Sequence, residues 1–326
     1  IAVNYSSVNP PLIAIIGPTT SGKSALALKL AKKLDGAVIS ADSQQMYRHA
    51  KIGTNQPNGH WHIATGKRKE VLRVKKLYVV QGVPHFFINT LSPNKQYSAV
   101  RFQAEVNKLC SKLFAIGQLP ILVGGTMLYV SAVVEGYRFP PGKPNLKLRA
   151  SLDRLSTAAL QKKLKQADPA TWRVIDRANR RRLIRALEHV MSTGSSFTQA
   201  QQHQPRPNTL ILGLAPSKAT LRRNITRRTK KMFNQGLAQE VRYLKKKFPH
   251  SPLLQSIGYR EVSAFLSGSI SRIEAEQQII SHTWQYAKRQ VTWFKRLPSV
   301  HWINSSPPAI ALTRTWLKQA KHQAGS

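Results

Sequence analysis

Short apolar runs alternate with longer helical patterns along most of the sequence. Four runs have the length and composition of strands buried on both faces: 12–16 (LIAII), 37–40 (AVIS), 120–123 (PILV) and 209–214 (TLILGL). Helix-forming stretches separate them, for example 25–34 after the first run and 100–114 before the third. Because alternating strands and helices build a parallel sheet with right-handed crossovers, we predict an α/β fold.

The pattern changes between about residues 137 and 208. Pro140, Pro141 and Pro144 open a segment with helical periodicity and no convincing strand, and the polar residues 201–207 close it. We therefore predict a helical, basic insertion over 137–207 in a core formed by 10–136 and 208–326. Within that core, 217–295 is again helical, with breaks at positions 236, 249, 258 and 268.

Composition adds a strong charge to this picture. The 326 residues include 51 Lys+Arg against 13 Asp+Glu, a formal net charge of +38, so the expected partner is a polyanion. Intrinsic disorder is not expected, because six Trp, nine Tyr and ten Phe accompany the apolar runs. The basic insertion, as a set of charges, is a candidate footprint for RNA phosphates.

Several function classes are excluded or disfavoured by what is scarce. The single cysteine, Cys110, excludes a disulfide framework and a Cys-based zinc site, favours a reducing cytoplasm, and is expected in the core. The ten histidines lack metal-ligand spacing. The sequence contains no run of about 18 apolar residues, the length needed to span a membrane. Residues 1–5 look like a trimmed or disordered terminus and not a signal peptide.

A phosphate-binding loop follows the first strand. The run GPTTSGKS matches G-x-x-x-x-G-K-[ST] and stands between a strand and a helix, the context that this loop requires. Its backbone N–H groups can surround phosphate oxygens, Lys23 supplies a charge, and the Ser24 hydroxyl can ligate Mg²⁺. An incidental glycine-rich turn is the alternative. The predicted di- or triphosphate contacts are Gly17, Pro18, Thr19, Thr20, Ser21, Gly22, Lys23 and Ser24.

A carboxylate ends the second predicted strand. P-loop motors place an acid after another core strand, but here the run 121–123 ends in Gly124-Gly125-Thr126. Asp42, after the strand 37–40, is the acid expected near the loop. It could hold Mg²⁺ through water, act as a general base, or simply cap a helix N-terminus.

With these two motifs in place, the sequence resembles the tRNA dimethylallyltransferase family, also called tRNA isopentenylpyrophosphate transferases. The resemblance covers roughly residues 10–300 and is carried by GPTTSGKS (17–24), SADSQQMY (40–47), IGTNQP (52–57), ILVGGTMLYV (121–130), RRLIRALE (181–188), SIGYRE (256–261) and AKRQVTWF (287–294). It implies transfer of a dimethylallyl group from dimethylallyl diphosphate to the exocyclic N6 amine of the adenosine 3′-adjacent to the anticodon of tRNA.

The resemblance implies a role for each motif. Thr19, Lys23 and their loop would bind the diphosphate, with Ser24 on Mg²⁺. Asp42 would take the proton from the attacking amine, and Arg228 would be a second contact to the diphosphate. Asp42, Thr19 and Arg228 are thus the predicted catalytic residues, and Thr126 would lie in the channel where adenosine and diphosphate meet. We expect a monomer.

The same resemblance implies a set of tRNA contacts in four segments besides Thr126. The predicted residues are Asp42, Ser43, Gln44, Gln45, Arg181, Arg182, Leu183, Ile184, Arg185, Gln255, Ser256, Ile257, Gly258, Tyr259, Arg260, Lys288, Arg289, Gln290, Val291, Thr292, Trp293, Phe294 and Lys295. Aromatic residues in the last helix could stack on bases, although helical spacing places Val291 and Phe294 on its apolar side.

Several positions depart from the family's usual residues. Lys51 stands where an Asp is usual, Asn55-Gln56 replaces Ala-Lys, Asn89 lies in a stretch that normally contains Asp, and Asn224 replaces an Arg one turn before Arg228. Two other functions stay open at this point. One is a P-loop kinase of a nucleoside or small metabolite, and the other is an RNA-binding protein that kept the fold with weak catalysis.

Overall fold

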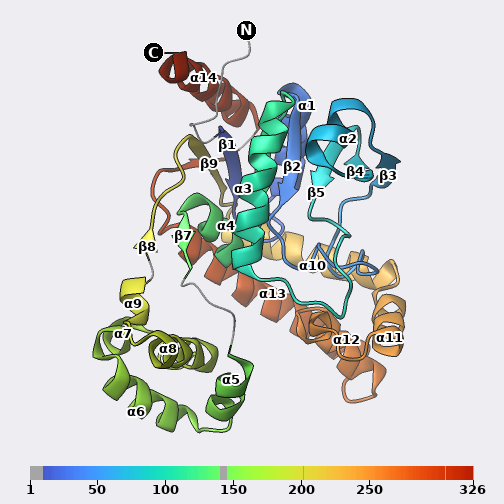
Figure 1. The fold of residues 1–326 in the computed structure, drawn as a ribbon. Helices are drawn as coiled ribbons and strands as arrows, with labels where there is room; N and C mark the ends of the chain where they lie inside the picture. Colours follow the sequence, from blue (N-terminus) through green and yellow to red (C-terminus); the bar gives the residue numbers. More distant parts are fainter. Residues whose placement is uncertain (1–9, 140–144, 201, 305, 326) are drawn as a thin grey trace. The chain divides into compact units, whose positions relative to one another are not determined.

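The computed structural model describes residues 10–139, 145–200, 202–304 and 306–325 (Figure 1). The predicted terminus at 1–5 and the prolines Pro140, Pro141 and Pro144 lie outside these residues. Contacts divide the chain into two compact units, Ile1–Val134 with Arg206–Ser326, and Glu135–Pro205. The boundaries expected from the sequence, at 137 and 207, lie close to these.

The first unit is built on one mixed sheet. Among the described residues it has eight strands in the order β10-β9-β1-β6-β2-β5-β4-β3. Pairing is parallel from β10 to β5 and antiparallel from β5 through β4 to β3. The strands are β1 (Leu12–Ile16), β2 (Gly36–Ser40), β3 (His60–Ile63), β4 (Lys76–Val80), β5 (Val83–Phe86), β6 (Leu119–Val123), β9 (Thr209–Leu214) and β10 (Val300–Ile303).

The four strands predicted from apolar runs are confirmed as β1, β2, β6 and β9, and they pair in parallel as predicted. The antiparallel edge formed by β5, β4 and β3 was not part of the prediction. A two-residue turn, Gln81-Gly82, joins β4 to β5, and both residues have positive φ (47° and 84°). Such a turn produces an antiparallel hairpin. The edge strand β3 is exposed at every position, so it has no apolar run that would mark it as a strand.

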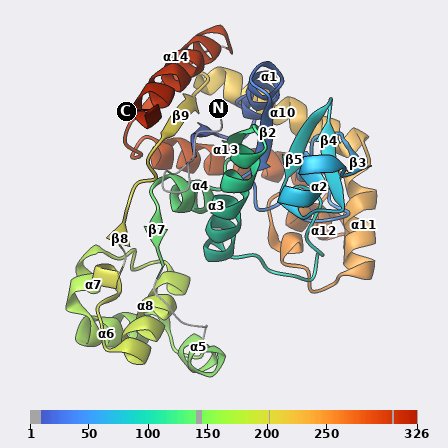
Figure 2. The same cartoon turned by 45° about the horizontal axis from the view of Figure 1, so that its top comes forward.

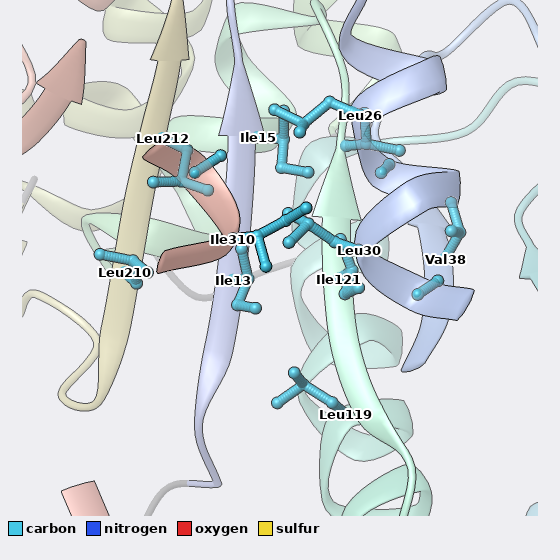
Figure 3. Packing of buried hydrophobic residues seen from close by; sticks show 14 of the residues in the cluster. Ile13, Ile15, Leu26, Leu30, Val38, Leu119, Ile121, Leu210, Leu212 and Ile310 are labelled. Carbon is cyan, nitrogen blue, oxygen red and sulfur yellow. The ribbon is translucent and has the colours of Figure 1, made fainter. Parts of the chain in front are cut away.

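The core lies between the sheet and two helices. Helix α1 (Lys23–Lys33) and helix α14 (Ser306–Gly325) pack on the face that Ile13 and Ile15 of β1 share with neighbouring strands. Figure 3 shows Leu30 of α1 and Ile310 of α14 close to these side chains. Because β1 is buried at all five positions, it fixes the loop that follows it.

Further helices pack around the same sheet. Helix α3 (Ala99–Ala115) packs on α4 (Met127–Val134), where Phe102 stacks on Tyr129 with ring centroids 4.4 Å apart. Helix α2 (Gly66–Leu72) contacts α3. Cys110 is fully buried in α3, which confirms its predicted place in the core.

The C-terminal helices break where the sequence predicts. They are α10 (Lys218–Asn234), α11 (Leu237–Lys247), the 3-10 helix η1 (Pro252–Gln255), α12 (Tyr259–Leu266) and α13 (Arg272–Phe294), and positions 236, 249, 258 and 268 fall between them. Tyr259 is fully buried in the cluster that joins α10 to α13. None of the helices in the described part of the chain is long and apolar enough to cross a membrane.

The second unit is a small helical bundle. Its helices are α5 (Leu146–Asp153), α6 (Thr157–Ala167), α7 (Pro169–Val174), α8 (Arg180–Thr193) and α9 (Phe197–Ala200). Figure 2 shows α6 and α7 beside α8, which supplies Leu183 and Leu187 to the apolar cluster of this unit. No strand was expected here, but β7 (Tyr137–Arg138) pairs with β8 (Gln202–His203) where the chain enters and leaves.

Candidate active site

The loop after β1 has the backbone of a phosphate-binding loop. Gly17 has φ 143°, and a Cβ there would lie 2.3 Å from the carbonyl oxygen of Leu214, so only glycine fits. Gly22, with φ 94°, immediately precedes α1, and the loop amides therefore gather at a helix N-terminus. Lys23 Nζ donates to the Pro18 carbonyl at 2.6 Å, and Ser24 is exposed in the first turn.

A cleft of about 850 Å³ opens beside this loop. Its walls come from the P-loop, the loop after β2, the Gly124–Thr126 loop after β6, and helices α10 and α13. Since β1, β2 and β6 are parallel neighbours, the loops at their carboxyl ends meet at one edge of the sheet. This edge is where α/β sheets bind ligands, and the volume fits a substrate of moderate size.

Helix α10 adds two side chains to the P-loop. Arg228 donates through Nη1 to the Thr19 hydroxyl at 2.7 Å, and Asn224 donates to the Thr20 carbonyl at 3.2 Å. The structure thus brings together the three predicted catalytic residues, Thr19, Asp42 and Arg228, in the same cleft. Asn224, noted only as a departure from the family, is in contact with the loop.

The cleft also holds two hydroxyls without a protein partner. Thr20 Oγ1 and Ser21 Oγ are buried, and no described residue forms a hydrogen bond with either. A buried hydroxyl without a partner is costly. A phosphate group in the cleft would supply the missing acceptor oxygens.

Two cationic side chains in the cleft, Lys23 and Arg228, could bind an anion, and burial lowers the pKa of both. Burial lowers the pKa of Lys23 to about 7, with Asp42 opposing and Arg228 adding to the shift. Burial also lowers the pKa of Arg228 to about 10, against the effect of Asp42. The side chains of Lys23, Asp42 and Arg228 are partly exposed because they line an open cleft. The surrounding protein nevertheless disfavours their charged forms.

Asp42 is oriented by the loop after β2. Its Oδ1 accepts the N–H of Gln44 at 3.0 Å, and the next residue, Ser43, donates its N–H to Thr126 Oγ1 at 3.0 Å. No helix begins here in the described chain, so Asp42 is not a helix cap. Burial raises the pKa of Asp42, while its Gln44 contact and Lys23 oppose the rise.

One residue of the predicted tRNA set, Gln290, forms a hydrogen bond with the P-loop. Gln290 of α13 is 1% exposed, accepts the N–H of Thr19 at 2.8 Å and donates to the Gly125 carbonyl at 2.6 Å. The tRNA contact of Gln290 stays a prediction, while its side chain is buried against these two loops at the wall of the cleft. Helical spacing could have shown this, since Ala287, Gln290 and Phe294 share one face.

The other predicted tRNA residues divide by burial. Leu183, Ile184, Tyr259 and Phe294 have buried side chains that pack in the protein, and the tRNA contact of their segments stays a prediction. The Trp293 indole donates to Ser131 at 2.9 Å and is partly exposed. The predicted residues with exposed side chains are Arg181, Arg182 and Arg185 in the second unit, and Gln255, Arg260, Lys288, Arg289, Thr292 and Lys295 in the first.

The positions that depart from the family lie near the same loops. Asn55 and Asn89 have positive φ (50° and 54°), a conformation that asparagine tolerates better than most residues. The Gln56 amide donates to the carbonyls of Gln45 and Tyr47 at 2.9 and 2.7 Å, and Lys51 is exposed. Of these positions, Asn55 lines the cleft and Gln56 holds the backbone of the loop after β2.

Comparison with known proteins shows which family this chain belongs to. A family model described as IPP transferase matches residues 45–297. The chain is also 36% identical over 320 residues to a tRNA dimethylallyltransferase of Thermomicrobium roseum, across 96% of this chain and 90% of the relative. The chain belongs to the IPP transferase family. The resemblance seen in the sequence is thereby confirmed.

Solved structures agree with this membership. The full-length tRNA isopentenylpyrophosphate transferase of Bacillus halodurans aligns with this chain at a TM-score of 0.66 and 31% identity, over 97% of this chain and 98% of that one. A eukaryotic dimethylallyltransferase described as acting on tRNA has a TM-score of 0.78 at 24% identity, over 95% of this chain and 80% of that one. The second likeness concerns the fold alone.

Proposed function

We propose that this protein transfers a dimethylallyl group from dimethylallyl diphosphate to the N6 amine of the adenosine 3′-adjacent to the anticodon of tRNA. The observation that carries the proposal is one cleft, in a member of the IPP transferase family, where a P-loop and Arg228 face a carboxylate. The amine nitrogen forms a bond to the allylic carbon, the carbon–oxygen bond breaks, and its electron pair leaves with the diphosphate.

The P-loop side of the cleft suits the leaving group. Negative charge accumulates on the diphosphate as the carbon–oxygen bond breaks, and preformed cations and N–H groups stabilise it. Lys23, Arg228 and the amides before α1 would supply these groups. The unpartnered hydroxyls of Thr20 and Ser21 would donate to the same oxygens.

The opposite side suits proton removal. Asp42 would accept the proton that the amine loses as it becomes bonded to carbon. Its raised pKa makes the carboxylate a better base than an exposed aspartate. Its orientation comes from the Gln44 N–H, and Thr126 on the neighbouring loop would line the channel to the adenosine.

A magnesium ion fits this cleft only together with the diphosphate. The described residues contain no group of three or more His, Cys, Asp or Glu side chains that could hold a metal. Mg²⁺ commonly binds one or two protein oxygens, and substrate phosphates and water supply its remaining ligands. Ser24 would therefore hold it beside the phosphates, where it would neutralise charge on the leaving group.

tRNA is the acceptor in this proposal. An adenine amine within a stacked anticodon loop is unreachable, so the base must leave the stack and enter the cleft. The exposed arginines of α8 and the exposed cations at the end of α13 would contact the anticodon stem-loop phosphates. Steep weakening of tRNA binding by salt is the expected signature.

The test uses radiolabelled dimethylallyl diphosphate and unmodified tRNA. Label should move to tRNA, and should not move to a transcript in which guanosine replaces the adenosine beside the anticodon. If tRNA binds tightly in low salt but label never transfers, the chain is an RNA-binding protein that lacks the proposed activity. Phosphotransfer from ATP to a nucleoside would instead indicate a kinase.

A further inference from the structure

Gln290 connects two loops that lie far from it in the sequence. Its side chain projects from α13 and is almost fully buried, although exposed Lys288 and Arg289 precede it. The N–H of Thr19 can only donate and the carbonyl of Gly125 can only accept, so both ends of the carboxamide are used in one orientation. Among the described residues, Thr19 N–H has no second acceptor.

Both loops carry groups of the proposed reaction. Thr19 is in the P-loop, and its hydroxyl accepts a hydrogen bond from Arg228. Gly125 precedes Thr126, whose hydroxyl accepts the N–H of Ser43 beside Asp42. A single side chain thus joins the loop that would hold the diphosphate to the loop that contacts Ser43, the neighbour of the proposed general base Asp42.

The packing around Gly125 matches this contact. A Cβ on Gly125 would lie 2.3 Å from Gln290 Nε2, and a Cβ on Gly124 would lie 2.2 Å from the Ala41 carbonyl oxygen. The Gly-Gly pair therefore lets the loop approach both α13 and the segment before Asp42. The Tyr286 hydroxyl also donates to the Gly125 carbonyl, at 3.2 Å.

We propose that Gln290 is a positioning residue that fixes the P-loop relative to the Asp42 side of the cleft through the Thr19 and Gly125 backbone groups. The inference rests on the proposed function for its catalytic consequence. Its effect on diphosphate binding does not depend on that function. Because reacting groups displaced by about 1 Å can lose about 100-fold in rate, a small shift of either loop is enough to be measured.

The experiment compares Gln290→Met, which keeps the length but loses both hydrogen bonds, with Gln278→Met on the exposed surface of the same helix. Inorganic diphosphate affinity, kcat and KM for tRNA prenylation, and melting temperature are measured for each. Gln290→Met should lower kcat/KM by about 100-fold and weaken diphosphate binding, whereas Gln278→Met should stay within about twofold. A purely structural role would lower the melting temperature and leave kcat per folded protein unchanged.

Gln290→Glu gives an independent signature. An ionised glutamate accepts from Thr19 but repels the Gly125 carbonyl, whereas a protonated one donates to it again. Its kcat relative to the native protein should therefore rise as the pH falls. A pH-independent ratio, or a folded Gln290→Met protein with native kcat and diphosphate affinity, would overturn the proposal.

A double substitution tests the contact itself. Gly125→Ala should impair diphosphate binding in the native protein, and should cost much less when Gln290→Ala has removed the clashing amide. Strictly additive losses would contradict the contact. If the native protein fails to prenylate tRNA, the proposed function fails, while the diphosphate measurements still decide the role of Gln290.

Discussion

The pKa of Lys23 predicts that diphosphate binding depends on pH. In the unliganded protein this pKa is lowered to about 7, chiefly by burial. A bound diphosphate places negative charge beside the ammonium and raises the pKa again. Above pH 7 each diphosphate therefore binds together with a proton, and affinity falls as the pH rises.

The size of the effect follows from the fraction of charged Lys23. With a pKa near 7, about nine-tenths of the chains carry the charge at pH 6 and about one-tenth at pH 8, so the apparent affinity should fall about tenfold over that range. A further tenfold loss per pH unit should follow above pH 8. Asp42 raises the pKa of Lys23, so its removal should move the curve of affinity against pH to lower pH.

The assay is calorimetric titration with inorganic diphosphate from pH 6 to 9 in buffers of different ionisation enthalpy. At pH 8 the native protein should take up close to one proton per bound diphosphate. Lys23→Arg is the control, because a guanidinium stays charged and leaves only the ionisation of the ligand itself. If the native and Lys23→Arg affinities change in parallel, or no proton is taken up, the reasoning is refuted.

Three further substitutions test separate parts of the structure. Asp42→Asn should lower kcat for prenyl transfer about 100-fold or more at saturating dimethylallyl diphosphate, as measured by single-turnover kinetics, while calorimetry follows the shifted pH dependence of its diphosphate binding. Gly17→Ala should abolish diphosphate binding in a folded protein, because its Cβ would meet the Leu214 carbonyl; circular dichroism checks the fold. Leu164→Ala, fully buried in the second unit, should destabilise that unit by about 2–5 kcal/mol in denaturant titrations.

The parts of the fold that could be predicted are those with a local signal. β1 and β9 are continuous apolar runs, and the P-loop has glycines that its backbone demands. β3 is exposed throughout, and β10 is a short strand with two exposed residues, so neither has such a run. The direction of β4 is set by the positive φ of Gln81 and Gly82, which the sequence pattern did not reveal.

The site was predictable where a motif carries its chemistry. The P-loop with Lys23 follows β1 and Asp42 follows β2, so their meeting in one cleft follows from a parallel sheet. Gln290 was placed among the tRNA contacts because the family resemblance implies that role for the whole segment 288–295. Its contacts with Thr19 and Gly125 span 271 and 165 residues, and only the folded chain brings those groups together.

The central claim is tested most directly by mass analysis of the product nucleoside. Unmodified tRNA is incubated with this protein and dimethylallyl diphosphate, digested, and sequenced by tandem mass spectrometry. We expect one added C5H8 unit on N6 of the adenosine 3′-adjacent to the anticodon, and none with Asp42→Asn over the same time. An unmodified adenosine, with the protein folded and binding both diphosphate and tRNA, would contradict the account.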